Sequence, residues 1–134
     1  MFEQEGVNLD RVVIGHCGDT EDVAHLEKLL SKGGFIGMDR FGVDILLAME
    51  KRVSTVAEMC RRGHAGRMVL SHDACCHFDF FPDELVRANA PRWNFRHIPD
   101  EVIPALREEG VSEEQIRTLT VDNPRRVFAQ QGAY

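Results

Sequence analysis

Three short apolar runs, each ending in polar residues, constrain the fold of this chain more than any other feature. They span residues 11–16, 34–40 and 67–73. Each run is almost continuously apolar, which is typical of strands that are buried on both faces, as in a parallel sheet. The pattern therefore predicts three buried strands that each end in polar, potentially reactive residues.

Helical patterns separate these runs. Asp19 to Asp22 supply an N-cap and an acidic first turn for a helix over residues 23–30, which ends before Gly33. Apolar positions recur at helical spacing over residues 53–60, and Gly63 follows them. The alternation of strands and helices indicates βαβ units, so we expect an α/β fold with parallel strands and right-handed crossovers.

The last part of the chain begins with a long segment, residues 74–97, that contains two prolines and little periodicity. Loops of this length inside compact domains are usually functional. A helix is then expected around residues 102–106, and Ser112 opens a capping box for another. Asn123 and Pro124 predict the N-cap and first residue of a final helix. No repeat or linker interrupts the chain, so residues 1–134 are expected to form a single unit.

Composition narrows the function classes. The chain has 134 residues, 43% of them hydrophobic, which is enough for one domain with a core. Its net charge is −6 and its basic residues are scattered, so a nucleic-acid partner is not expected. No apolar stretch approaches the roughly 20 residues that span a membrane, and the acidic start differs from a signal peptide. We expect a cytoplasmic protein without a membrane partner, whose four cysteines are reduced thiols.

The polar residues at the three strand ends are candidates for a site. They are His16, then Asp39 and Arg40, then Asp73. In parallel α/β folds the carboxyl ends of the strands face the active site, and neighbouring strands lie about 4.8 Å apart. An imidazole and a carboxylate are ligands that catalytic zinc prefers. Each residue also has a structural interpretation: a hydrogen-bonded histidine, a turn cap, or an internal Asp39–Arg40 salt bridge. The pattern alone leaves both interpretations open.

Five segments of the chain resemble the phosphotriesterase family, and most closely its phosphotriesterase-like lactonase branch. They are residues 14–20 (IGHCGDT), 35–42 (FIGMDRFG), 70–73 (LSHD), 90–93 (APRW) and 122–124 (DNP). The resemblance extends over practically the whole chain. It implies a (β/α)₈ TIM barrel of the amidohydrolase superfamily, of which residues 1–134 would be the C-terminal part, from the sixth strand to the C-terminal helix.

The resemblance also implies a metal-dependent hydrolase. Family members hold two divalent metals, with zinc expected first and cobalt, iron or manganese as alternatives. His16 matches the ligand on the sixth strand. Asp73 matches the ligand on the eighth strand, which also accepts a proton from the hydroxide that bridges the metals. The implied substrates are lactones of the N-acyl-homoserine type, with organophosphate triesters as a side activity.

A substrate pocket is implied as well. Arg40 matches an arginine that borders the pocket of the lactonases, and residues 74–93 match the long eighth loop that shapes the acyl channel. The residues assigned to substrate binding are Arg40, Cys75, Phe80 and Trp93. Phe78 and Phe81 would add apolar surface, although core packing explains these aromatic residues equally well. Ala74 and Phe80 depart from residues of some lactonases, which leaves the substrate preference open.

Most of the family's ligands are missing from this sequence. The chain has no His-x-His pair, and its lysines lie in or beside the expected helices, so none suits the carboxylated lysine. Residues 1–10 are expected to be the tail of the fifth helix, and a whole barrel needs about 250 residues. We therefore expect a homo-oligomer or association with a missing N-terminal half. The alternative is a catalytically inactive half-barrel or assembly module that binds no metal alone.

Overall fold

A three-stranded parallel sheet lies at the centre of the computed structural model, which describes residues 4–77 and 79–129. The strands, in sheet order, are β1 (Val13–Ile14), β2 (Phe35–Met38) and β3 (Met68–Leu70). The register pairs Val13 with Phe35 and Ile36 with Met68. The predicted parallel sheet is confirmed. Its strands are shorter than the apolar runs because the polar ends of the runs leave the extended conformation.

The two crossovers contain the helices expected from the apolar spacing. Helix α1 (Val23–Leu30) is capped by Asp22, whose carboxylate accepts the amide hydrogen of His25 at 3.0 Å. Helix α2 (Met49–Arg61) covers the second expected helix and extends it toward the N-terminus. Short 3₁₀ turns accompany the strands: η1 (Leu9–Arg11), η2 (Cys17–Asp19) and η3 (Ala65–Arg67).

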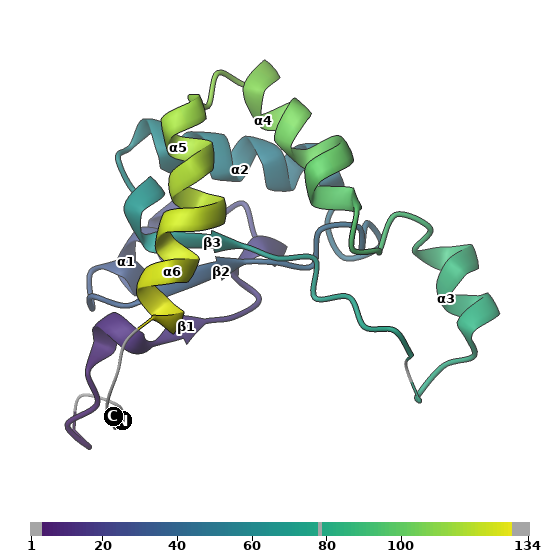
Figure 1. The fold of residues 1–134 in the computed structure, drawn as a ribbon, viewed down its shortest axis with the longest axis horizontal. Helices are drawn as coiled ribbons and strands as arrows, with labels where there is room; N and C mark the ends of the chain where they lie inside the picture. Colours follow the sequence, from purple (N-terminus) through teal and green to yellow (C-terminus); the bar gives the residue numbers. More distant parts are fainter. Residues whose placement is uncertain (1–3, 78, 130–134) are drawn as a thin grey trace.

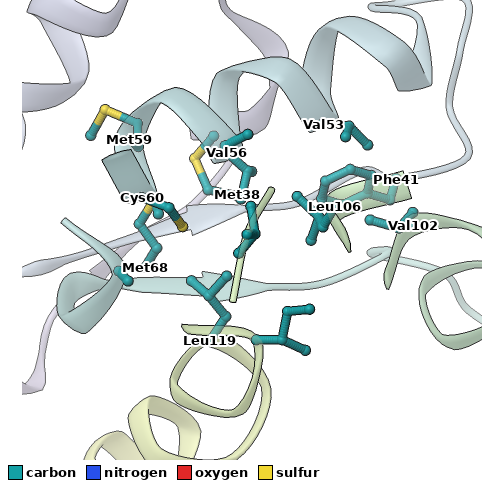
Figure 2. Packing of buried hydrophobic residues seen from close by; sticks show 14 of the residues in the cluster. Met38, Phe41, Val53, Val56, Met59, Cys60, Met68, Val102, Leu106 and Leu119 are labelled. Atoms are coloured by element: carbon teal, nitrogen blue, oxygen red, sulfur yellow. The ribbon is translucent and has the colours of Figure 1, made fainter. Parts of the chain in front are cut away.

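The core lies where α2, the sheet and the C-terminal helices meet (Figure 1). Figure 2 shows side chains from each element pointing into the same space. Met38, Val56, Met59, Leu106 and Leu119 are completely buried there. Burying one such side chain contributes about 1.5–3 kcal/mol relative to leaving it exposed. This packing fixes α2 behind the strands and so holds the strand ends in place.

Two continuous helical stretches form the C-terminal part, and each contains a π turn that ends two residues before a proline. Their segments are η4 (Ile98–Val102), α4 (Ile103–Glu108), α5 (Glu113–Arg117), η5 (Thr118–Asp122) and α6 (Asn123–Phe128). The amide of Ile103 donates to Ile98 O and that of Asn123 to Thr118 O, five residues back. Because proline has no amide hydrogen, a wide turn there accommodates the missing helical bond.

The structure confirms the predicted capping box at Ser112 and corrects the predicted N-cap at Asn123. The capping box at Ser112 is present, with reciprocal hydrogen bonds between Ser112 and Gln115. Asn123 does not cap a new helix, because the chain is already helical at Asp122. Its side chain is instead buried and donates to the carbonyls of Ala65 and Met68, both at 2.7 Å.

Two further segments differ from expectation. The long segment after β3 contains a helix, α3 (Asp83–Asn89), which Figure 1 shows set apart from the other helices. The described residues before β1 form turns and η1 rather than the end of an α-helix. Phe78 lies outside the described residues.

No helix in residues 4–77 and 79–129 is long and apolar enough to cross a bilayer.

Candidate functional site

The three strand ends share an unusual backbone conformation. His16, Arg40 and Asp73 have φ values of 60°, 60° and 54°. Among the described residues, no other residue except glycine has a positive φ. The left-handed conformation costs an ordinary side chain roughly 1–2 kcal/mol, and it persists only where surrounding contacts enforce it. Such strain is concentrated at functional sites, so the three residues mark one edge of the sheet as a candidate site.

The two residues predicted as metal ligands come together at this edge. His16 Nδ1 lies 4.0 Å from Asp73 Oδ2, and about half of each side chain is exposed. An imidazole and a carboxylate fit the donor types of a divalent metal site. However, no group of three His, Cys, Asp or Glu residues in the described part of the chain is arranged to surround one ion. The pair therefore suits two ligands of a larger set, and their role as ligands stays a prediction.

Arg40 connects the candidate ligand Asp73 to a second carboxylate. Its Nη1 donates to Asp19 Oδ2 at 2.7 Å, and its Nε lies 3.6 Å from Asp73 Oδ2. Partial burial tends to lower the pKa of Arg40, but the carboxylates of Asp19, Asp73 and Asp39 outweigh it and raise the pKa. Arg40 is therefore a permanent cation beside Asp73. The Asp39–Arg40 salt bridge considered from the sequence is replaced by the Asp19 and Asp73 pairs.

Asp39 instead faces His16. Its Oδ2 accepts the backbone amide hydrogen of His16 at 2.8 Å, and its Oδ1 lies 3.2 Å from His16 Nδ1. The residue is only 8% exposed. Gly18 lets the chain pass directly against Asp39, because a Cβ there would lie 2.6 Å from the Asp39 carbonyl oxygen. This close approach fixes the backbone that carries the carboxylate.

A buried arginine behind the strand ends was missed by the sequence interpretation. Arg52 of α2 is fully buried and forms an ion pair with Asp19 Oδ1 at 2.7 Å. Its guanidinium also donates to four carbonyls, those of Gly18, Asp39, Val43 and Leu47. Its position, four residues before Val56 on the apolar face of α2, was the available signal that it would be buried. Arg52 thus ties the loops after β1 and β2 together.

A cavity of about 800 Å³ opens beside the strand ends. Arg40 and Asp73 lie in its wall, together with predominantly apolar residues of the loop after β3 and of α3. Of the residues assigned to substrate binding, Arg40, Cys75 and Trp93 line this cavity. Phe80 is not among the lining residues and is 82% exposed, so its assignment stays a prediction without structural support. Phe81 does line the cavity.

The loop that carries these residues is anchored at its C-terminal end. Trp93 Nε1 donates to the carbonyl of His72 at 2.7 Å, and Arg92 Nη2 pairs with Asp44 at 3.1 Å. Gly42, with φ of 99°, allows the closest approach, since a Cβ there would lie 2.5 Å from Arg92 O. These contacts place the wall of the cavity against the loop after β2.

Comparisons with known proteins agree with this architecture. The model of the phosphotriesterase family matches residues 1–128. The solved structure of the phosphotriesterase from Mycobacterium tuberculosis is 58% identical and superimposes with a TM-score of 0.95, covering 99% of this chain and 41% of that one. A mutant PTE-like lactonase from Deinococcus radiodurans is 32% identical with a TM-score of 0.85, covering 94% of this chain and 41% of that one.

Sequence comparison also finds a similar curated protein. The aryldialkylphosphatase of Saccharolobus solfataricus is 38% identical over 131 residues, which are 96% of this chain and 42% of that protein. The chain therefore spans about two fifths of the length of the curated relatives it matches.

Proposed function

The chain belongs to the phosphotriesterase family, and we propose that it supplies one side of the active site of a metal-dependent hydrolase. Its parallel sheet and helices are the corresponding part of that family's (β/α)₈ barrel. We further propose lactones as substrates, with organophosphate triesters hydrolysed as a side activity. Residues 1–134 would act as one partial-barrel unit that runs from the sixth strand to the C-terminal helix.

The observation that carries this proposal is the meeting of His16 and Asp73, 4.0 Å apart, beside the cavity that Arg40 borders. The two residues come from opposite edge strands of the sheet, and both side chains are half exposed. In the proposed site they would hold divalent metals, zinc first among them, together with ligands supplied from outside this chain. Divalent metals supply Lewis-acid activation of water and of the substrate oxygen at neutral pH.

The residues of this chain have distinct tasks in the proposed reaction. Asp73 has lone pairs besides the one that binds metal, so it accepts the proton of the attacking water. Arg40, a cation 3.6 Å from Asp73 Oδ2, orients that carboxylate between turnovers. The apolar wall of the cavity, with Trp93 and Phe81, binds the aliphatic tail of a lactone and excludes water. Cys75 lies in the same wall, where it limits the width of the channel.

The test measures metal content and lactone hydrolysis of the purified chain, alone and mixed with a family N-terminal half. Asp73→Asn keeps the shape of the side chain but removes its charge, so the rate should fall by about 10²–10⁴-fold, the usual contribution of a general base. His16→Asn should lower the metal content. Glu108→Gln, an exposed change in α4, is the matched control and should alter neither quantity. Full activity in Asp73→Asn would refute the proposed role.

A second function is suggested by the sheet, in which β1 and β3 are the outer strands. The chain would then be a catalytically inactive half-barrel or assembly module. Such a module would bury the open edges of β1 and β3 against a second copy or an N-terminal half. Its signature is a solution mass above 15.2 kDa together with no bound metal and no turnover. An active, metal-loaded assembly supports the first proposal instead.

A further inference from the structure

Asp39 offers both of its carboxylate oxygens to the same residue. One accepts the backbone amide hydrogen of His16 at 2.8 Å, and the other lies 3.2 Å from the ring nitrogen Nδ1. A carboxylate only accepts hydrogen bonds, so a bond to the ring requires the proton to be on Nδ1. A neutral imidazole carries one N–H, and the lone pair then remains on Nε2.

We propose that Asp39 is a positioning residue that holds the His16 ring with its proton on Nδ1 and thereby reserves Nε2 for a metal ion. The part that concerns the metal rests on the proposed function. The tautomer itself does not, because it follows from the contacts of Asp39 alone. Histidine ligands commonly donate their second ring N–H to a carboxylate, which fixes both tautomer and orientation.

The surroundings of Asp39 suit this task. Its backbone carbonyl accepts from Arg52 Nη1 at 3.0 Å, and Gly18 packs directly against its main chain. The main chain that carries the carboxylate is thus held by a buried cation and a close backbone contact, whereas the His16 side chain is half exposed. The rigid partner therefore determines the orientation of the mobile one. The bond to the His16 amide also supports the left-handed backbone of that residue.

The opposite arrangement is a definite alternative. Nδ1 also lies 4.0 Å from Asp73 Oδ2, so Nδ1 could be the ligand nitrogen, with its proton on Nε2. Asp39 would then compete with the metal rather than position the ring. The two arrangements predict opposite tautomers of His16 in the metal-free chain, and nitrogen chemical shifts distinguish them.

The experiment records long-range proton–nitrogen NMR spectra of the metal-free chain at a pH of about 8.5, where an ordinary histidine is neutral. His16 should carry its proton on Nδ1. Asp39→Asn leaves one acceptor for two donors, so the amide NH₂ group should face Nδ1 and shift the proton to Nε2. Zinc ions titrated into the chain at neutral pH should bind Asp39→Asn about 10–100-fold more weakly, the usual effect of losing such a partner.

Glu27→Gln is the matched control. Glu27 Oε1 lies 3.1 Å from Nε2 of His64, so this change removes a carboxylate from the opposite ring nitrogen of a different histidine. It should alter the His64 signals and leave those of His16 and the zinc affinity unchanged.

Each outcome decides a separate point. A proton on Nε2 of His16 in the unsubstituted chain overturns the inference, even if Asp39→Asn fails to fold. Equal zinc affinity of the two proteins overturns the positioning role. Absence of zinc binding by the unsubstituted chain, with the proton on Nδ1, counts against metal binding by this chain and supports the hold of Asp39 on the ring.

Discussion

The buried guanidinium of Arg52 holds together the two loops that carry the strand-end residues. Its five N–H groups face five acceptors, which are four backbone carbonyls and the carboxylate of Asp19. Arg52→Lys keeps the charge but offers only three donors, so at least two of the five contacts are lost. Val43 O also accepts from the Leu46 amide, so at least one of the other acceptors is left without a donor. Each buried acceptor left unsatisfied costs about 1–3 kcal/mol. One unsatisfied acceptor and one further lost hydrogen bond, worth about 1 kcal/mol, together lower the expected free energy of unfolding by about 2–4 kcal/mol.

This loss is large compared with the total stability of a small domain, about 5–15 kcal/mol. Urea unfolding followed by circular dichroism measures it as a lower midpoint at an unchanged slope. Arg61→Lys is the matched control, because Arg61 lies in the same helix but is exposed and pairs with Glu58. That change should cost less than about 1 kcal/mol. If Arg52→Lys and Arg61→Lys have the same midpoint, the donor count for Arg52 is wrong.

Three further predictions follow from individual contacts. Asn123→Ala removes two buried hydrogen bonds, to the carbonyls of Ala65 and Met68, and should lower the free energy of unfolding in urea by about 1–3 kcal/mol, whereas Asn89→Ala on the exposed face of α3 should cost less than about 1 kcal/mol. Gly42→Ala adds a Cβ 2.5 Å from Arg92 O at a positive φ, so it should lower the thermal midpoint and increase proteolysis of the loop after β3. Burial raises the pKa of the Cys60 thiol to about 11 from 9.0. The unfolded chain releases this proton first, so stability should fall between those pH values, and Cys60→Ala should reduce the fall.

The regular elements could be predicted from the sequence because their signals are local. Apolar runs and helical spacing are properties of neighbouring residues, and they gave the three strands, α1 and α2. The capping box at Ser112 is equally local. Helix α3 was missed because it has no buried residue, so its sequence lacks an apolar periodicity. The π turn before Pro124 was missed because helix continuity there depends on the buried side chain of Asn123.

The candidate site was predictable in part. The strand ends His16, Arg40 and Asp73 follow from the sheet pattern, and the family resemblance gave them roles. The partners of these residues could not be predicted, because they depend on pairing between distant segments. Asp39 lies 23 residues from His16, and Arg52 reaches Gly18 across 34 residues. Phe80 shows that the resemblance alone can also mislead. It was assigned to substrate binding, but it does not line the cavity.

The left-handed backbone at Asp73 makes a final prediction that separates function from stability. At φ of 54° an alanine is strained and a glycine is not, so Asp73→Gly should be more stable than Asp73→Ala by about 1 kcal/mol. Lys28, exposed within α1, is the control, because in a helix the order reverses and Lys28→Gly is the less stable variant. Both pairs are compared by urea unfolding. An alanine variant at Asp73 that is as stable as the glycine variant would show that the strand end relaxes without cost. A more stable glycine variant would instead show that the backbone at Asp73 is strained. An aspartate at a strained position lowers the stability of the fold, which is expected where its carboxylate is needed for catalysis or binding.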